Sequence, residues 1–209
     1  MTADHKARFQ DQLNVSRETI SRLDAYEALL RKWNPAINLV SPATLAGVWE
    51  RHFLDSAQLF SISAPTHGRW VDLGSGGGFP GLVVAILALE KCPALEVLLV
   101  ESDKRKSAFL STVARELSLN VTVLAERIEA IPALRANVVS ARALAPLDKL
   151  LGFANRHLSP DGLAIFPKGA GWRQELATAQ ESWSFKYQMS PSETESEAAI
   201  LTITEVSRA

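Results

Sequence analysis

The chain has 209 residues, 47% apolar and 22% charged, the balance of an ordinary soluble globular protein that can bury a sizeable core. Its formal net charge of −1 argues mildly against a free-standing DNA-binding protein, a class that is usually basic. A single cysteine excludes a disulfide framework and a cysteine-based zinc site. The sequence shows neither an apolar leader nor an apolar run of membrane-spanning length. We therefore expect a cytoplasmic protein with neither a metal nor a membrane span.

The first 65 residues predict a helical lead-in. Ser16 can cap a helix that runs to about Trp33, because apolar residues recur there at near-helical spacing. Asn34-Pro35 is expected to end it, and a second amphipathic helix is expected over Leu45–Phe60. A linker around residues 63–68 follows.

From Arg69 onward, apolar runs of strand length alternate with helical segments. The expected strands are Trp70–Leu73, Glu96–Val100, Val121–Leu124, Asn137–Ser140, Leu163–Phe166, Ser184–Gln188 and Ala199–Thr204. The expected helices are Leu82–Glu90, Lys104–Leu117, a short one near Arg127–Ile131, Leu147–Leu158 and Trp172–Gln180. This alternation predicts a Rossmann-like α/β domain over residues 66–209, with a mostly parallel seven-stranded sheet that ends in an antiparallel pair.

The most informative segment is Asp72–Gly81, which follows the first expected strand and opens a helix. Its glycines let the backbone turn sharply and approach a ligand closely. Gly76, Gly78 and Gly81 match the G-x-G-x-x-G pattern of dinucleotide sites, and Glu101 follows 20 residues after Gly81, where a ribose-binding acid would lie. An NAD-dependent oxidoreductase is therefore a real alternative, and a non-catalytic nucleic-acid-binding module is a third.

Two residues of this segment favour S-adenosylmethionine over a dinucleotide. The carboxylate of Asp72 at the strand tip could neutralise a cationic ligand and would repel a pyrophosphate. Pro80 removes a backbone N–H that a pyrophosphate would use. Glu101 fits either ligand, since both carry a ribose. After the fourth expected strand, Ser140–Leu144 lacks the Asn/Asp-Pro-Pro-aromatic pattern of enzymes that methylate exocyclic amines, and it brings Arg142 to the ligand edge.

These motifs together resemble those of the bacterial small-subunit (16S) rRNA guanine-N7 methyltransferases (RsmG, formerly GidB). The motif most specific to this family is Arg51–Ser56, ahead of the glycine segment, because general methyltransferases lack it. Glu101 departs from the common Asp, Phe166-Pro167 departs from the usual residues before Lys168, and the chain after Gln180 matches poorly. The matching pieces, in the family's order, are Trp33-Asn34, Asn38-Leu39, Arg51–Ser56, Asp72–Gly81, Arg105-Lys106 with Ala108–Leu110, Arg127–Glu129, Ser140–Ala143 and Lys168-Gly169.

The resemblance implies S-adenosylmethionine as the cofactor and 16S rRNA, naked or within an assembling small subunit, as the partner. It implies cofactor contacts at Gly74, Phe79, Ile128, Glu129 and Arg142, to which the residues themselves add Asp72, Gly76 and Glu101. Guanine N7 carries no proton, so no general base is required.

Basic residues complete the expected site. Arg142 and Lys168 are the cations placed nearest the reacting atoms, and we expect catalytic roles for them. The expected RNA-binding residues are Arg51, His52, Arg105, Lys106 and Lys168.

Overall fold

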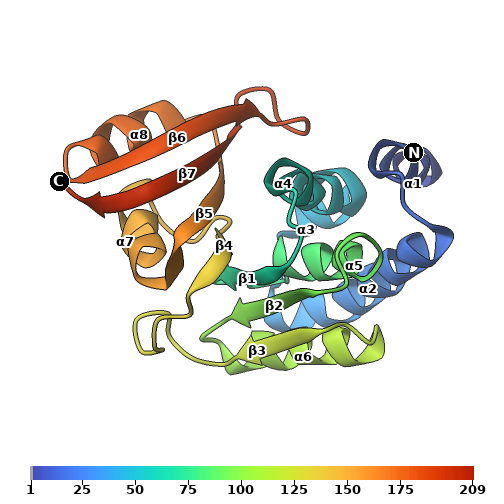
Figure 1. Cartoon of the computed structure of the whole chain (residues 1–209). Helices are drawn as coiled ribbons and strands as arrows, with labels where there is room; N and C mark the ends of the chain where they lie inside the picture. Colours follow the sequence, from blue (N-terminus) through green and yellow to red (C-terminus); the bar gives the residue numbers. More distant parts are fainter. Residues whose placement is uncertain (1) are drawn as a thin grey trace.

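A seven-stranded sheet with the strand order β3-β2-β1-β4-β5-β7-β6 forms the centre of the molecule (Figure 1). The computed structural model describes residues 2–209, with side chains from Asp4 onward. Strands β1 to β5 are parallel, and β7 is antiparallel to both of its neighbours, which confirms the predicted sheet. The strands are β1 (Gly68–Leu73), β2 (Leu95–Val100), β3 (Val121–Leu124), β4 (Ala136–Ser140), β5 (Leu158–Lys168), β6 (Trp183–Pro191) and β7 (Ala199–Arg208).

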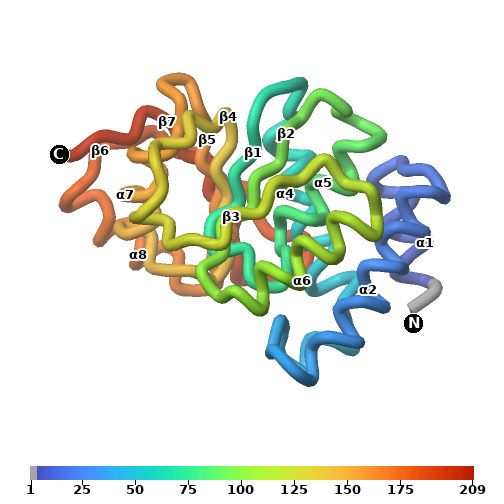
Figure 2. Tube along the Cα trace, turned by 90° about the horizontal axis from the view of Figure 1, so that it is seen from below, coloured from blue at the N-terminus to red at the C-terminus, as the bar shows by residue number. Residues whose placement is uncertain are grey.

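Helices cover both faces of the sheet (Figures 1 and 2). Alternation along β1 assigns Trp70 to the core with α5 and α6, and Val71 to the core with α7 and α8. Within residues 2–209, no helix combines the length and the apolarity that a bilayer crossing needs. The helices are α1 (Thr2–Leu13), α2 (Arg17–Ile37), α3 (Pro42–Leu45), the π-helix η1 (Trp49–Leu54), α4 (Asp55–Ser63), α5 (Gly81–Lys91), α6 (Lys104–Glu116), α7 (Leu147–His157) and α8 (Trp172–Gln180).

The N-terminal helices share one core with the sheet domain. Tyr26 of α2 and Phe53 of η1 are fully buried in the same cluster as Leu82 of α5 and Phe109 of α6. Tyr26 also donates a hydrogen bond to the carbonyl of Gly77 in the glycine segment. The helices before residue 65 therefore brace the segment that follows β1.

The expected end of the first long helix at Asn34-Pro35 is wrong. Helix α2 continues through Pro35 to Ile37. The bond that Pro35 cannot donate would go to the Arg31 carbonyl, and both residues are exposed, so water can take its place. Asn38, in the left-handed conformation, ends the helix. The side chain of Asn34 then accepts the backbone N–H groups of Leu39 and Val40 at 2.8 and 2.9 Å.

Two other helical predictions are wrong. The helix expected over Leu45–Phe60 is divided into the end of α3, η1 and α4, with a turn at Gly47, a residue that weakens helices. The π-helix η1 contains Arg51 and His52, and such wider turns are frequent at functional sites. No helix forms near Arg127–Ile131, where a turn from Arg127 to Ala130 takes its place.

Candidate active site

A cavity of about 470 Å³ lies at the carboxyl ends of β1, β2, β3 and β4, where open α/β sheets bind ligands. We call it the first cavity. Seven of the residues expected to contact a cofactor line it, namely Gly74, Gly76, Phe79, Glu101, Ile128, Glu129 and Arg142. Leu39, Lys149 and Phe153 also line it and were not predicted, because they come from the lead-in and from α7, which carry no recognisable ligand motif.

Glu101 shapes the glycine segment as well as the wall of the first cavity. One carboxylate oxygen accepts the backbone N–H of Gly76 at 2.9 Å, and the other accepts that of Asp103 at 2.8 Å. The residue is only 8% exposed. Each oxygen keeps a second lone pair, so the carboxylate can still accept hydrogen bonds from a ligand.

Two glycines of the glycine segment leave room for different neighbours, one for a ligand and the other for a side chain of the protein. A Cβ at Gly76, where φ is +54°, would meet nothing nearer than the Gly74 carbonyl oxygen at 3.8 Å, so the segment there is open toward the first cavity. A Cβ at Gly74, where φ is +65°, would lie 2.6 Å from Leu144. Gly74 therefore allows close packing against the segment that follows β4.

Asp72 is the expected cofactor residue that the structure places elsewhere. It is fully buried and lies outside the lining of the first cavity, because strand alternation directs its side chain under α5. Its Oδ2 accepts the N–H of Gly81 at 3.2 Å, and its Oδ1 accepts the hydroxyl of Ser140 at 2.8 Å. Burial raises the pKa of Asp72 to about 6, although these hydrogen bonds and Arg142 oppose the shift.

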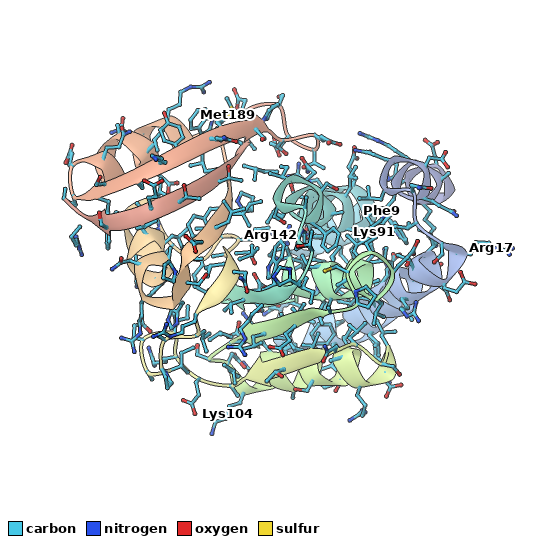
Figure 3. The ribbon with its side chains drawn as sticks, in the orientation of Figure 1. Phe9, Arg17, Lys91, Lys104, Arg142 and Met189 are labelled. Atoms are coloured by element: carbon cyan, nitrogen blue, oxygen red, sulfur yellow. The ribbon has the colours of Figure 1, made fainter. Side chains whose placement is uncertain are left out.

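Arg142 is held by residues of η1 and α4, in the middle of the molecule (Figure 3). It donates to Asp55 at 3.1 Å, to the Arg51 carbonyl at 3.3 Å and to His52 Nδ1 at 2.9 Å. Its guanidinium also lies 5.0 Å from the ring centroid of Phe79, within cation–π range. Asp55 could not be recognised as its partner from sequence, since 87 residues separate them.

His52 is a buried, neutral side chain. Burial, together with the nearby charges of Arg142 and Arg51, lowers its pKa from the ordinary value of 6.5 to about 3. Because Arg142 can only donate, His52 Nδ1 accepts, and its Nε2–H donates to Thr44 Oγ1 at 2.9 Å. The ring stacks on Phe79 with centroids 4.8 Å apart. His52 therefore contacts both Arg142 and Phe79 as a neutral side chain. It also lines a second cavity beside Arg51, and its expected contact with RNA stays a prediction.

Lys168, expected to contact RNA and to take part in catalysis, is largely buried and paired, and both roles stay predictions. Its side chain is 9% exposed and pairs with Glu175 at 2.6 Å. It donates in addition to the Ala145 carbonyl at 3.2 Å, which fixes the end of the segment after β4. Lys168 and Arg142 both line this second cavity, which has a volume of about 650 Å³ and lies next to the first.

The remaining expected RNA residues lie in two places. Arg51 lines the second cavity and forms an exposed ion pair with Glu195 at 2.6 Å. Lys106 lines the first cavity, and Arg105 beside it has a side chain that is 71% exposed. Lys104, the preceding residue, lies at the outer edge of the molecule (Figure 3).

Residues 19–201 match the family model described as rRNA small subunit methyltransferase G. A Ribosomal RNA small subunit methyltransferase G of Ruegeria pomeroyi is 54% identical over 196 residues, covering 94% of this chain and 96% of the relative. That of Cereibacter sphaeroides is 51% identical over 201 residues, covering 96% of each. The chain is therefore similar to these relatives along nearly its whole length.

Solved structures show the same fold at low identity. A TehB-like SAM-dependent methyltransferase from Corynebacterium glutamicum superposes with a TM-score of 0.57 at 17% identity, covering 87% of this chain and 98% of that one. A mutant of MtNAS in complex with S-adenosylmethionine gives 0.59 at 15% identity, covering 88% and 74%. At these identities the likeness is one of fold.

Proposed function

Because this chain belongs to the rRNA small subunit methyltransferase G family, we propose that it transfers a methyl group from S-adenosylmethionine to N7 of one guanine in 16S rRNA. The observation that carries the proposal is the first cavity, whose glycine segment, Glu101 and Arg142 meet at the carboxyl ends of the strands. Since rRNA is the substrate, we infer a cytoplasmic location.

The residues of the first cavity fit the cofactor. Its volume of about 470 Å³ lies within the usual range for small-molecule sites, about 300–1,000 Å³. Gly76 offers an open backbone surface, and Glu101 offers carboxylate lone pairs suited to ribose hydroxyls. Arg142, one of four cations in the lining, can donate to the carboxylate of the methionine part of the cofactor. When bound, S-adenosylmethionine supplies an electrophilic methyl group on a positively charged sulfur.

The amino end of α5 disfavours NAD. A dinucleotide pyrophosphate needs free N–H groups at this helix end. Here the Gly81 N–H bonds to Asp72 and the Leu82 N–H bonds to the Gly78 carbonyl at 2.8 Å, while Pro80 has no N–H. Asp72 thus disfavours a pyrophosphate by capping the helix.

Methyl transfer to N7 requires the protein mainly to position the guanine against the methyl group of the cofactor. Guanine N7 presents a lone pair with no proton to remove, so a general base is unnecessary. We propose that Arg142, fixed by Asp55 and His52, orients the acceptor by donating a hydrogen bond to the guanine oxygen, while positive charge passes from the sulfur to the purine. Lys168 supports the wall between the two cavities through the Ala145 carbonyl.

We propose that Arg51, Arg105 and Lys106 contact rRNA phosphates. Arg105 and Arg51 are exposed, and Lys106 stands at the edge of the first cavity. Electrostatic contacts of this kind supply much of the affinity for nucleic acid.

Deletion of the gene tests the proposal. Borohydride and aniline cleave RNA at 7-methylguanine, so one cleavage site in small-subunit rRNA should vanish in the deletion strain and return on complementation. Identical cleavage in parent and deletion strains would exclude this product. Calorimetric titration provides a second check, because S-adenosylmethionine should bind and NAD should not.

A further inference from the structure

The second cavity adjoins the first across Arg142–Ala145, which line both. We propose, resting on the function proposed above, that it receives the target guanine and that Glu195 reads the Watson–Crick edge of the base. A base seated there would face the first cavity across the shared wall. Leu144, Pro146, Pro167 and Ile200 supply apolar lining for its flat faces.

One wall of the second cavity comes from the segment between β6 and β7, residues 192–198. Figure 1 shows this connection reaching from the end of the sheet toward α4. The Thr194 hydroxyl donates to Asp55 at 2.9 Å, and the Glu193 N–H donates to Gln58 at 2.8 Å. The segment is thereby fixed to the helix that also holds Arg142. It brings Ser192, Thr194, Glu195 and Ala198 to the cavity.

Guanine is distinguished from adenine by the donors N1–H and N2–H₂ on its Watson–Crick edge, which match the two oxygens of one carboxylate. Three carboxylates line the second cavity. Asp55 has both oxygens engaged, by Arg142 and Thr194. Glu175 accepts from both Lys168 and the Leu147 N–H through one oxygen, Oε2, and this pair of contacts holds its carboxylate against α7 and β5. Glu195, with a single contact to an exposed arginine, is the carboxylate that is most free to meet a base.

Glu195 has the freedom that this role requires. Its Oε2 pairs with Arg51, and its Oε1 has no hydrogen-bond partner within the part of the chain whose side chains are described, Asp4 onward. The pair is half exposed, at 47% and 50%, and such ion pairs contribute little to stability. Arg51 can therefore hold the carboxylate at the rim while the base takes up the open acceptor positions.

The test compares Glu195→Gln with Glu197→Gln, which removes the same charge from an exposed residue of the same segment outside the cavity lining. Each is assayed on rRNA from the deletion strain and on the same RNA with inosine, which lacks the N2 amino group, at the mapped target position. We expect Glu195→Gln to lower kcat/KM on the guanine substrate by about tenfold or more, the loss of one charge-assisted hydrogen bond. Glu197→Gln should match the wild type, and neither should change S-adenosylmethionine affinity.

Inosine gives the sharper readout. The wild type should lose about tenfold on inosine, and Glu195→Gln should lose less than about threefold, because the reading carboxylate is already gone. Equal activity of the two variants, or an inosine loss in Glu195→Gln as large as in the wild type, overturns the inference. Wild-type protein that methylates no rRNA overturns the proposed function instead.

Discussion

Arg142 and Asp55 form an ion pair at 3.1 Å in which the two side chains are only 18% and 17% exposed. Asp55 is held in turn by Thr194, so the guanidinium next to both cavities is fixed by α4 and by the connection between β6 and β7. The orientation of Arg142 therefore depends on elements far from β4 in the chain.

Asp55→Asn should lower kcat more than tenfold and the free energy of unfolding by about 1.5–3 kcal/mol, since Arg142 loses its charged acceptor. Steady-state kinetics and urea unfolding measure the two effects. Glu50→Gln is the control, because it removes a carboxylate that pairs with Arg8 on the surface at 3.5 Å. Wild-type kcat in Asp55→Asn would show that the ion pair does not position Arg142.

Glu101→Ala should weaken S-adenosylmethionine binding by about tenfold or more, through loss of charge-assisted hydrogen bonds. It should also destabilise the protein, because the N–H groups of Gly76 and Asp103 lose their acceptor. Calorimetry and thermal unfolding separate the two effects. Glu96→Gln, at an exposed position of β2, the strand that Glu101 follows, should change neither affinity nor stability measurably. Unchanged affinity in Glu101→Ala would leave the residue a purely structural role.

Asp72 should make the folded state less stable as the pH rises from about 4 to 6. Its folded pKa of about 6 is raised, mainly by burial, so over this range the folded protein retains a proton that the unfolded chain releases. The free energy of unfolding of the wild type, relative to Asp72→Asn, should fall by about 2–3 kcal/mol between pH 4 and pH 7 and stay level above it. Urea unfolding across this range measures the difference, and a constant difference would contradict the raised pKa.

Gly74→Ala should reduce stability and cofactor binding, because the new Cβ would lie 2.6 Å from Leu144. A second change, Leu144→Ala, should restore much of the loss and leave about 1–2 kcal/mol of strain from the positive φ. A double-mutant cycle by thermal unfolding and calorimetry measures the coupling. Strictly additive effects would show that Leu144 is not the obstacle.

Replacing Arg105 and Lys106 by Gln should weaken rRNA binding, while cofactor affinity stays nearly the same. The salt dependence of binding should become shallower by about one unit of slope for each phosphate that the protein no longer neutralises. Arg115→Gln, on the last turn of the same helix and 73% exposed, is the control. Filter binding at several salt concentrations measures the slope. If Arg115→Gln changed the slope as much as the double replacement does, Arg105 and Lys106 would not be the RNA-binding surface.

Local pattern predicted the strands and most helices well, because apolar periodicity and capping act over a few residues. Trp172–Gln180 has the same bounds in the structure as in the prediction. The helix end predicted at Asn34-Pro35 was wrong because Pro35 lies on the exposed side of α2, where water can replace the one hydrogen bond that it cannot donate.

The site was predictable where the residues follow strand ends directly, as with Glu101 and Arg142, since parallel strands bring their carboxyl ends to one edge. Side-chain pairing was not predictable. Asp72, next to the end of β1, bonds to the N–H of Gly81 at the start of α5, and Lys168 at the end of β5 is paired with Glu175 of α8. Such partners depend on packing between distant segments, which no local pattern records.

Strand β7 follows β6 in the chain but lies between β5 and β6 in the sheet. Without residues 199–208, β5 would keep a bare edge and β6 would have no neighbour to join. A chain cut short before β7 would therefore expose unpaired strand edges, a state prone to aggregation. Strand β7 thus connects β6 to the rest of the sheet and leaves β3 and β6 as the edge strands.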